Sequence, residues 1–158
     1  MTTLENIMPI DILIVEDNRA DIRLVQEIFK KGKLVVHLHA VLDGVEAMKY
    51  LRKEDEYKDA KRPDLILLDL NMPRKDGREV LEEIKSDAEL KIIPVIVMTI
   101  SKAEEDIFRS YNLHANAYIV KPIELIQFMK VVSSIEEFWL SVVKLPPNYD
   151  STIINIIK

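Results

Sequence analysis

The sequence contains no cysteine, only three glycines and a single tryptophan among its 158 residues. The absence of cysteine excludes disulfide bonds, catalytic thiols and zinc–thiolate sites. Its apolar runs are all far shorter than the roughly 20 residues that a membrane-spanning helix needs. The N-terminal residues 1–8 lack the basic region and long apolar run of a signal peptide, so we expect a cytoplasmic protein.

The overall composition is that of a soluble globular protein, with 48% hydrophobic and 31% charged residues. The net charge of −5 argues against general affinity for nucleic acid or for an anionic membrane. A chain of this length suffices for one domain with a substantial core. We expect that domain to span residues 9–144, between a flexible N-terminus at 1–8 and a C-terminal tail at 145–158.

Five apolar runs alternate with amphipathic stretches along the chain. The runs predict strands at 10–15, 34–41, 65–68, 92–98 and 115–120. Helices are predicted after the capping residues Asn18, Asp43 and Asp76, and at 101–112 and 124–143. Continuously apolar strands that alternate with helices are typical of an α/β fold. We therefore expect a doubly wound five-stranded parallel sheet with five helices, as in flavodoxin-like folds.

Functional sites of such folds lie outside the carboxyl ends of the strands. The residues at those ends are chemically distinctive, and they are Glu16, Asp17, Asp69, Thr99 and Lys121. Three carboxylates that converge repel one another unless a cation lies between them. A hard divalent cation such as Mg²⁺ suits oxygen ligands, and the backbone carbonyl of Asn71 is a further candidate ligand.

This set of residues suits phosphoryl transfer to Asp69. A carboxylate can attack phosphorus while a metal ion and Lys121 neutralise charge on the phosphoryl oxygens, and Thr99 can donate a hydrogen bond to the product. Single aspartates at strand ends are usually turn formers, and Lys-Pro dipeptides are common. The prediction therefore depends on the coincidence of several such residues at one edge of the sheet.

The same residues lie within an ordered set of motifs: ILIVEDN at 12–18, LLDLNMP at 67–73 with Asp76-Gly77 following, Met98-Thr99, and YIVKP at 118–122. In these motifs the chain resembles the receiver domains of two-component response regulators, over about residues 9–144. The resemblance implies that Asp69 accepts a phosphoryl group from a partner histidine kinase. It implies no enzymatic activity beyond the chain's own phosphotransfer and slow dephosphorylation.

The resemblance also implies roles for the other site residues. Glu16 and Asp17 would hold Mg²⁺ together with Asp69 and the Asn71 carbonyl. Lys121 would bridge to the phosphoryl group. Thr99 and Tyr118 would form a switch pair, in which the hydroxyl moves to the phosphoryl group and the ring turns inward.

Several further segments indicate one particular group of receivers. Residues 21–27, 76–81 and 135–140 and the charged extension before Pro63 are similar to stand-alone receivers that serve cyanobacterial-type phytochrome kinases. A light-regulated kinase is therefore the expected phosphoryl donor, although related receivers work with other kinases.

Apolar residues near the C-terminus predict self-association. Isoleucines occupy positions 153, 154, 156 and 157, and Val131, Phe138 and Leu140 lie off the core-facing stripe of the last predicted helix. We expect a homodimer formed by the fourth helix, the fifth strand and the fifth helix.

Three other functions compete with that of a phosphorylated receiver. A phosphatase of the haloacid dehalogenase-like class also uses an aspartate nucleophile, but its nucleophile follows the first strand and a second aspartate lies two residues on, where this chain has Asn71. A flavodoxin-like nucleotide carrier would bind phosphate in the first loop, where Glu16 and Asp17 repel it. A receiver that acts only by protein contact is disfavoured by the full set of acidic residues and Lys121.

Overall fold

The computed structural model describes residues 9–32, 35–99, 103, 115, 117–121, 126, 127, 130 and 134, without the side chains of Thr99 and Ala117. The predicted helices at 101–112 and 124–143 therefore fall mostly outside the described residues, as do the N-terminus and the C-terminal tail. In the described part, no helix is long and apolar enough to cross a membrane.

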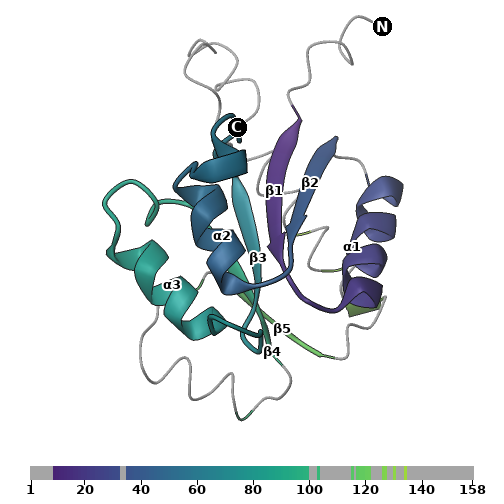
Figure 1. The fold of residues 1–158 in the computed structure, drawn as a ribbon. Helices are drawn as coiled ribbons and strands as arrows, with labels where there is room; N and C mark the ends of the chain where they lie inside the picture. Colours follow the sequence, from purple (N-terminus) through teal and green to yellow (C-terminus); the bar gives the residue numbers. More distant parts are fainter. Residues whose placement is uncertain are drawn as a thin grey trace, which may run out of the picture.

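Five parallel strands form one sheet in the order β2-β1-β3-β4-β5 (Figure 1). The strands are β1 (Ile10–Val15), β2 (Val36–Val41), β3 (Leu65–Asp69), β4 (Val95–Thr99) and β5 (Ala117–Val120). The helices are α1 (Arg19–Lys31), α2 (Gly44–Leu51) and α3 (Gly77–Ser86), with a short 3₁₀ turn, η2 (Asp55–Tyr57), after α2. The predicted fold class is confirmed.

The sheet separates two apolar cores because side chains alternate between its faces. On one face, α1 packs Ile22, Val25, Ile28 and Phe29 against the even-numbered residues of β1 and their neighbours. On the other face, α2 and α3 pack against the odd-numbered residues of β1 (Figure 1). All five residues of β3 are buried, as expected of a central strand covered on both faces.

The starts of the helices follow the predicted caps. The Asn18 side chain accepts hydrogen bonds from the N–H groups of Ala20 and Asp21, and Asp43 accepts one from Glu46. Asp76 caps α3 through the N–H of Arg78. These side chains satisfy backbone donors that the first turn of a helix leaves without partners, which fixes where each helix begins.

Three strands are shorter than their predicted runs. β5 begins at Ala117, and Ala115, where the run at 115–120 predicts its start, lies outside the strand. The run at 92–98 predicts a strand from residue 92, but β4 begins at Val95. Ile93 N–H closes a turn onto the Leu90 carbonyl, Ile92 is 56% exposed, and Pro94 has no N–H for a strand ladder. Likewise, Val35 precedes β2 and is exposed rather than part of the strand predicted from residue 34.

Candidate functional site

Asp69 ends β3 at the carboxyl edge of the sheet, where the sequence places it. Its residue is only 2% exposed. Its carboxylate is nevertheless partnered, because Oδ1 accepts the N–H of Asn71 at 3.1 Å and Oδ2 lies 3.4 Å from Nζ of Lys121. These contacts hold the buried carboxylate in a fixed orientation at the edge of the sheet.

Glu16 and Asp17 leave the end of β1 beside Asp69. Glu16 is fully buried, and its Oε2 accepts the N–H of Asn18 at 3.2 Å, whereas Asp17 is exposed. One carboxylate oxygen from each of Glu16, Asp17 and Asp69 lies within 4.8 Å of the others. The structure thus brings together the three carboxylates that the sequence selected as metal ligands.

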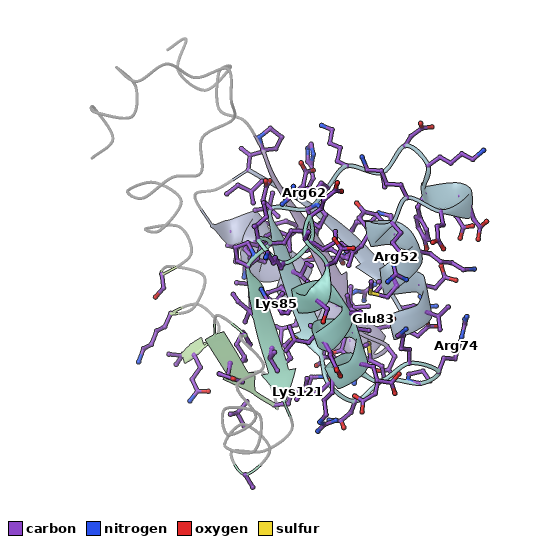
Figure 2. The ribbon with its side chains drawn as sticks, turned by 90° about the vertical axis from the view of Figure 1, so that its left-hand side faces the viewer. Arg52, Arg62, Arg74, Glu83, Lys85 and Lys121 are labelled. Carbon is purple, nitrogen blue, oxygen red and sulfur yellow. The ribbon has the colours of Figure 1, made fainter. Side chains whose placement is uncertain are left out.

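Lys121 follows β5 directly and lies at the lower end of the sheet in Figure 2. Its Nζ forms an ion pair with Glu16 and lies 3.2 Å from Oδ2 of Asp21, in addition to its contact with Asp69. The sequence predicted the approach of Lys121 to this edge. It gave Asp21 no part in the site, because an acidic residue in the first turn of a helix has an ordinary explanation in helix stability.

Charge at this edge is unbalanced. The pKa of Glu16 is raised to about 8: burial is the main cause, the hydrogen bond and the charge of the neighbouring Asp69 add to it, and Lys121 opposes the shift. Burial alone would lower the pKa of Lys121, but the hydrogen bond to Glu16 and the charges of Asp69 and Glu16 outweigh it, and its pKa is raised. One ammonium therefore stabilises the carboxylates only in part.

These residues fit a hard divalent cation. The three clustered groups offer carboxylate oxygens, the ligand type that such cations prefer. The raised pKa of Glu16 indicates that burial and the neighbouring Asp69 disfavour its charged form more than Lys121 favours it. A cation bound by Glu16, Asp17 and Asp69 would relieve that repulsion.

The other predicted site residues are placed in part. Thr99 ends β4, and its backbone pairs with Val120 of β5, but its side chain lies outside the described residues. Tyr118 of β5 is half-buried and packs against the core shared with α2 and α3. The Asn71 backbone anchors Asp69 through its N–H, while its carbonyl as a metal ligand stays a prediction.

Two glycines allow the loop that follows Asp69 to pack closely against neighbouring backbone. A Cβ on Gly77 would lie 2.1 Å from the Asp69 carbonyl oxygen, and a Cβ on Gly44 would lie 2.3 Å from the carbonyl oxygen of Lys75. Both distances are far below any van der Waals contact. Only glycine fits at either position without movement of the loop or of the helix that begins there.

An ion pair ties the same loop to the start of α2. Arg74 Nη1 lies 3.1 Å from Oδ2 of Asp43, the capping residue of α2. Arg74 has a left-handed backbone with φ of 65°. Sequence reasoning missed this contact, because nothing in the local pattern relates residues that are 31 positions apart.

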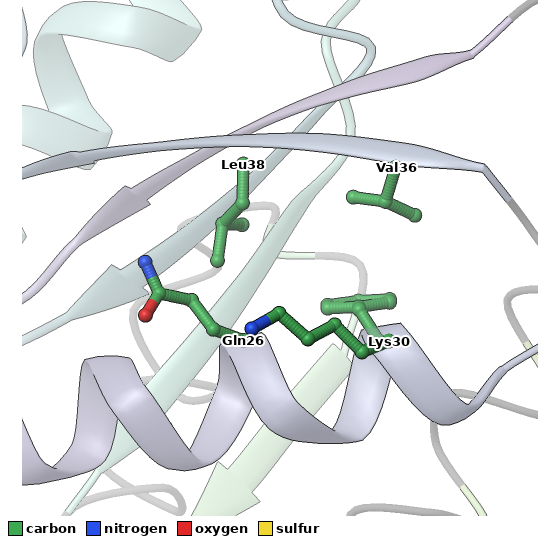
Figure 3. A pocket seen from close by; sticks show the side chains of 5 residues that line it. Gln26, Lys30, Val36 and Leu38 are labelled. Carbon is green, nitrogen blue, oxygen red and sulfur yellow. The ribbon is translucent and has the colours of Figure 1, made fainter.

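A pocket of about 380 Å³ lies elsewhere, between α1 and the edge strand β2. Figure 3 shows Gln26 and Lys30 of α1 facing Val36 and Leu38 of β2. Phe29 completes its lining. None of these five residues belongs to the carboxylate cluster, so the chemistry of the cluster takes place at the sheet edge and not in this pocket.

Comparisons with known proteins agree with this geometry. Residues 12–133 match the response regulator receiver domain family. Response regulator Rcp1 of Synechocystis sp. is 51% identical over 135 residues, which cover 85% of this chain and 92% of that protein. The probable methanogenesis regulatory protein FilR2 of Methanothrix harundinacea is 38% identical over 84% of each chain.

Solved structures give the same result. The phosphorylated cyanobacterial phytochrome response regulator RcpA matches with a TM-score of 0.76 and 57% identity, over 88% of this chain and 99% of its own. The Mn²⁺-bound form of Rcp1 matches with a TM-score of 0.75 and 51% identity, over 87% and 99% of the two chains. The bacteriophytochrome response regulator RtBRR matches with a TM-score of 0.76 and 36% identity, over 94% of this chain and 90% of its own.

Proposed function

The chain belongs to the response regulator receiver family, and we propose that it accepts a phosphoryl group on Asp69 from a partner histidine kinase. The observation that carries the proposal is the environment of Asp69. Its carboxylate is 2% exposed, lies at the carboxyl edge of the sheet, and is flanked by Lys121 and by the carboxylates of Glu16 and Asp17. The family match favours this reading over a dehalogenase-like phosphatase or a flavodoxin-like carrier.

In the proposed reaction, an Asp69 carboxylate oxygen forms a bond to phosphorus while the bond between phosphorus and the donor histidine nitrogen breaks. The histidine keeps the bonding electron pair and leaves as a neutral imidazole after it takes up a proton. Negative charge is spread over the phosphoryl oxygens in the transition state, where the ammonium of Lys121 stabilises it. The Asn71 N–H orients the nucleophile through Oδ1 of Asp69.

Mg²⁺ is the proposed resident cation, with Glu16, Asp17, Asp69 and the Asn71 carbonyl as ligands. The clustered carboxylates support this assignment, and the Mn²⁺-bound form of Rcp1 belongs to a relative with the same fold. When bound, the cation would supply positive charge that faces the oxygens of the phosphoryl group.

Thr99 and Tyr118 are the proposed switch pair. Thr99 ends the strand next to β3, and Tyr118 lies one strand further on, with its ring partly in the core beneath α2 and α3. A threonine hydroxyl that turned toward phosphorylated Asp69 would open space at the end of β4. We propose that the Tyr118 ring moves into that space.

The phosphoryl donor that we propose is a phytochrome-type histidine kinase. Among the similar structures, RcpA is a cyanobacterial phytochrome response regulator and RtBRR is a bacteriophytochrome response regulator. We further propose a cytoplasmic, homodimeric protein with its receiver domain at 9–144. The dimer face of the fourth helix, fifth strand and fifth helix falls largely outside the described residues, and so does the isoleucine-rich tail.

Intact-mass measurement tests the central proposal. The wild-type chain, incubated with Mg²⁺ and either an autophosphorylated phytochrome-type kinase or acetyl phosphate, should gain the mass of one phosphoryl group. Asp69→Asn should gain none, because the amide is not a nucleophile for this reaction. Asp59→Asn, which changes an exposed loop aspartate in the same way, should behave as wild type. Equal labelling of Asp69→Asn would refute the assignment.

A further inference from the structure

The ammonium of Lys121 has three carboxylate partners, and one of them is not a predicted metal ligand. Glu16 and Asp69 belong to the clustered carboxylates, whereas Asp21 comes from the first turn of α1. The distance from Nζ to Asp21 Oδ2 is 3.2 Å, and that to Asp69 Oδ2 is 3.4 Å. Lys121 therefore lies no closer to the proposed phosphoacceptor than to Asp21.

The position of Asp21 is well fixed. Its N–H donates to Oδ1 of the capping residue Asn18 at 3.1 Å, and the same oxygen also accepts the N–H of Ala20. Its side chain is 21% exposed and lies near the N-terminus of α1, where the helix dipole favours a negative charge. Asp21 thus presents an anchored carboxylate to Lys121.

Three carboxylates compete for the one ammonium, which lies within 4 Å of an oxygen of each. A phosphoryl group on Asp69 would bring new acceptor oxygens next to Nζ. To turn fully toward them, Lys121 would have to move away from an existing partner, and Asp21 is the partner whose release leaves the proposed metal ligands unchanged.

We infer that Asp21 is a positioning residue that keeps Lys121 turned partly away from Asp69 until the phosphoryl group arrives. This inference rests on the proposed phosphorylation of Asp69. It assigns Asp21 a restraining effect, because the contact between Lys121 and Asp21 must be loosened before the ammonium can fully stabilise the transferring phosphoryl oxygens. The loose transition state of phosphoryl transfer depends more on such stabilisation than on the strength of the nucleophile.

The rate of Asp69 phosphorylation by acetyl phosphate tests the inference. In this reaction the Asp69 oxygen bonds to phosphorus and acetate leaves, so no kinase surface takes part. Asp21→Asn keeps the shape of the side chain but removes its charge, and we expect phosphorylation to become about three- to fivefold faster, as for a partly exposed ion pair. Asp21→Glu, which restores the carboxylate, should return the rate toward that of wild type.

Two controls separate the action through Lys121 from other effects. Glu27→Gln removes an exposed charge further along α1 and should change the rate by less than twofold. In a Lys121→Gln background, whose slow labelling can be followed over long incubations, Asp21→Asn should also change the rate by less than twofold. Thermal unfolding of each variant would identify a loss of stability, which a merely structural role for Asp21 would produce without acceleration.

Specific outcomes would overturn the inference. A rate for Asp21→Asn within twofold of wild type would remove the restraining role. An acceleration of equal size in the Lys121→Gln background would show that Asp21 acts by its charge alone. Failure of the proposed function looks different, because then the wild-type chain would not be labelled, or Asp69→Asn would be labelled as well.

Discussion

The loop after β1 and the loop after β3 bring carboxylates to the same edge of the sheet, but different forces hold them. The first loop is short, and its Glu16 is fixed by polar contacts with Lys121 and with the N–H of Asn18. The second loop is longer and is held by close backbone packing at Gly77 and Gly44, with an ion pair from Arg74 to Asp43. One loop is positioned mainly by charge and the other mainly by shape.

The two loops therefore differ in how much movement they allow. Close packing of backbone atoms tolerates little displacement, so the backbone of Asp69 is held in one position relative to the start of α3. The contacts of Lys121 with Glu16 and Asp21 are made by side chains, so the exchange of partners that we infer needs no rearrangement of the backbone. A site that must hold its acceptor still while it exchanges ions and phosphoryl groups needs both properties.

The largest effect should come from the second loop. Gly77→Ala would place a Cβ 2.1 Å from the Asp69 carbonyl oxygen and 2.6 Å from Cα of Leu70. Because both neighbours are backbone atoms, the free energy of unfolding should fall by about 3 kcal/mol in urea denaturation. Gly32→Ala is the matched control, since φ of Gly32 is −81° and should allow alanine with a change below about 1 kcal/mol. Similar losses for both variants would contradict the steric account.

A different kind of effect is expected in the first loop. Glu16→Gln removes a buried carboxylate that already repels Asp69, so the free energy of unfolding should change by no more than about 1 kcal/mol. Mg²⁺ affinity, measured by titration calorimetry, should fall about tenfold or more. Glu82→Gln, an exposed change on α3, should leave Mg²⁺ affinity as it is. An unchanged Mg²⁺ affinity in Glu16→Gln would contradict the view that charge positions the loop after β1.

The smallest expected effect distinguishes two contributions within the second loop, the ion pair of Arg74 with Asp43 and the left-handed backbone of Arg74. Arg74→Ala loses the ion pair to Asp43 and keeps a left-handed backbone, whereas Arg74→Gly loses the ion pair and relieves the backbone. The glycine variant should be the more stable of the two by about 1 kcal/mol. Lys53, with φ of 56°, gives the same comparison at an exposed position outside the loop. A larger Ala–Gly difference at residue 74 than at 53 would show that the loop adds strain of its own.

The sequence predicted the sheet and its functional edge for a physical reason. A strand that is buried on both faces must be continuously apolar, so Leu65–Asp69 stands out in the sequence, and parallel strands bring their carboxyl ends together. The start of β4 was misplaced because apolarity alone does not show that Ile92 lies in a turn before Pro94. Ile93 is buried although it precedes the strand, so an apolar run can extend beyond the ladder of hydrogen bonds.

The remaining features depend on distances between residues that the sequence does not contain. Asp21 meets Lys121 only because α1 begins at the edge where β5 ends. In the sequence, Gly77 looks like an ordinary residue at the start of a helix. It must lack a side chain because the fold places the Asp69 carbonyl oxygen beside it. Local patterns therefore predicted the reacting groups, while the residues that position them emerged from the tertiary structure.

The backbone of Leu70 also determines how the site behaves in time. Its N–H donates to the Met98 carbonyl at 3.1 Å, and its own carbonyl accepts the N–H of Gly77 at 3.0 Å. The residue next to the proposed acceptor is thus joined to β4 on one side and to α3 on the other, so it can open to solvent only when the centre of the sheet opens. A phosphoryl group on Asp69 would therefore be attached to a backbone that keeps its place while the group is gained and lost.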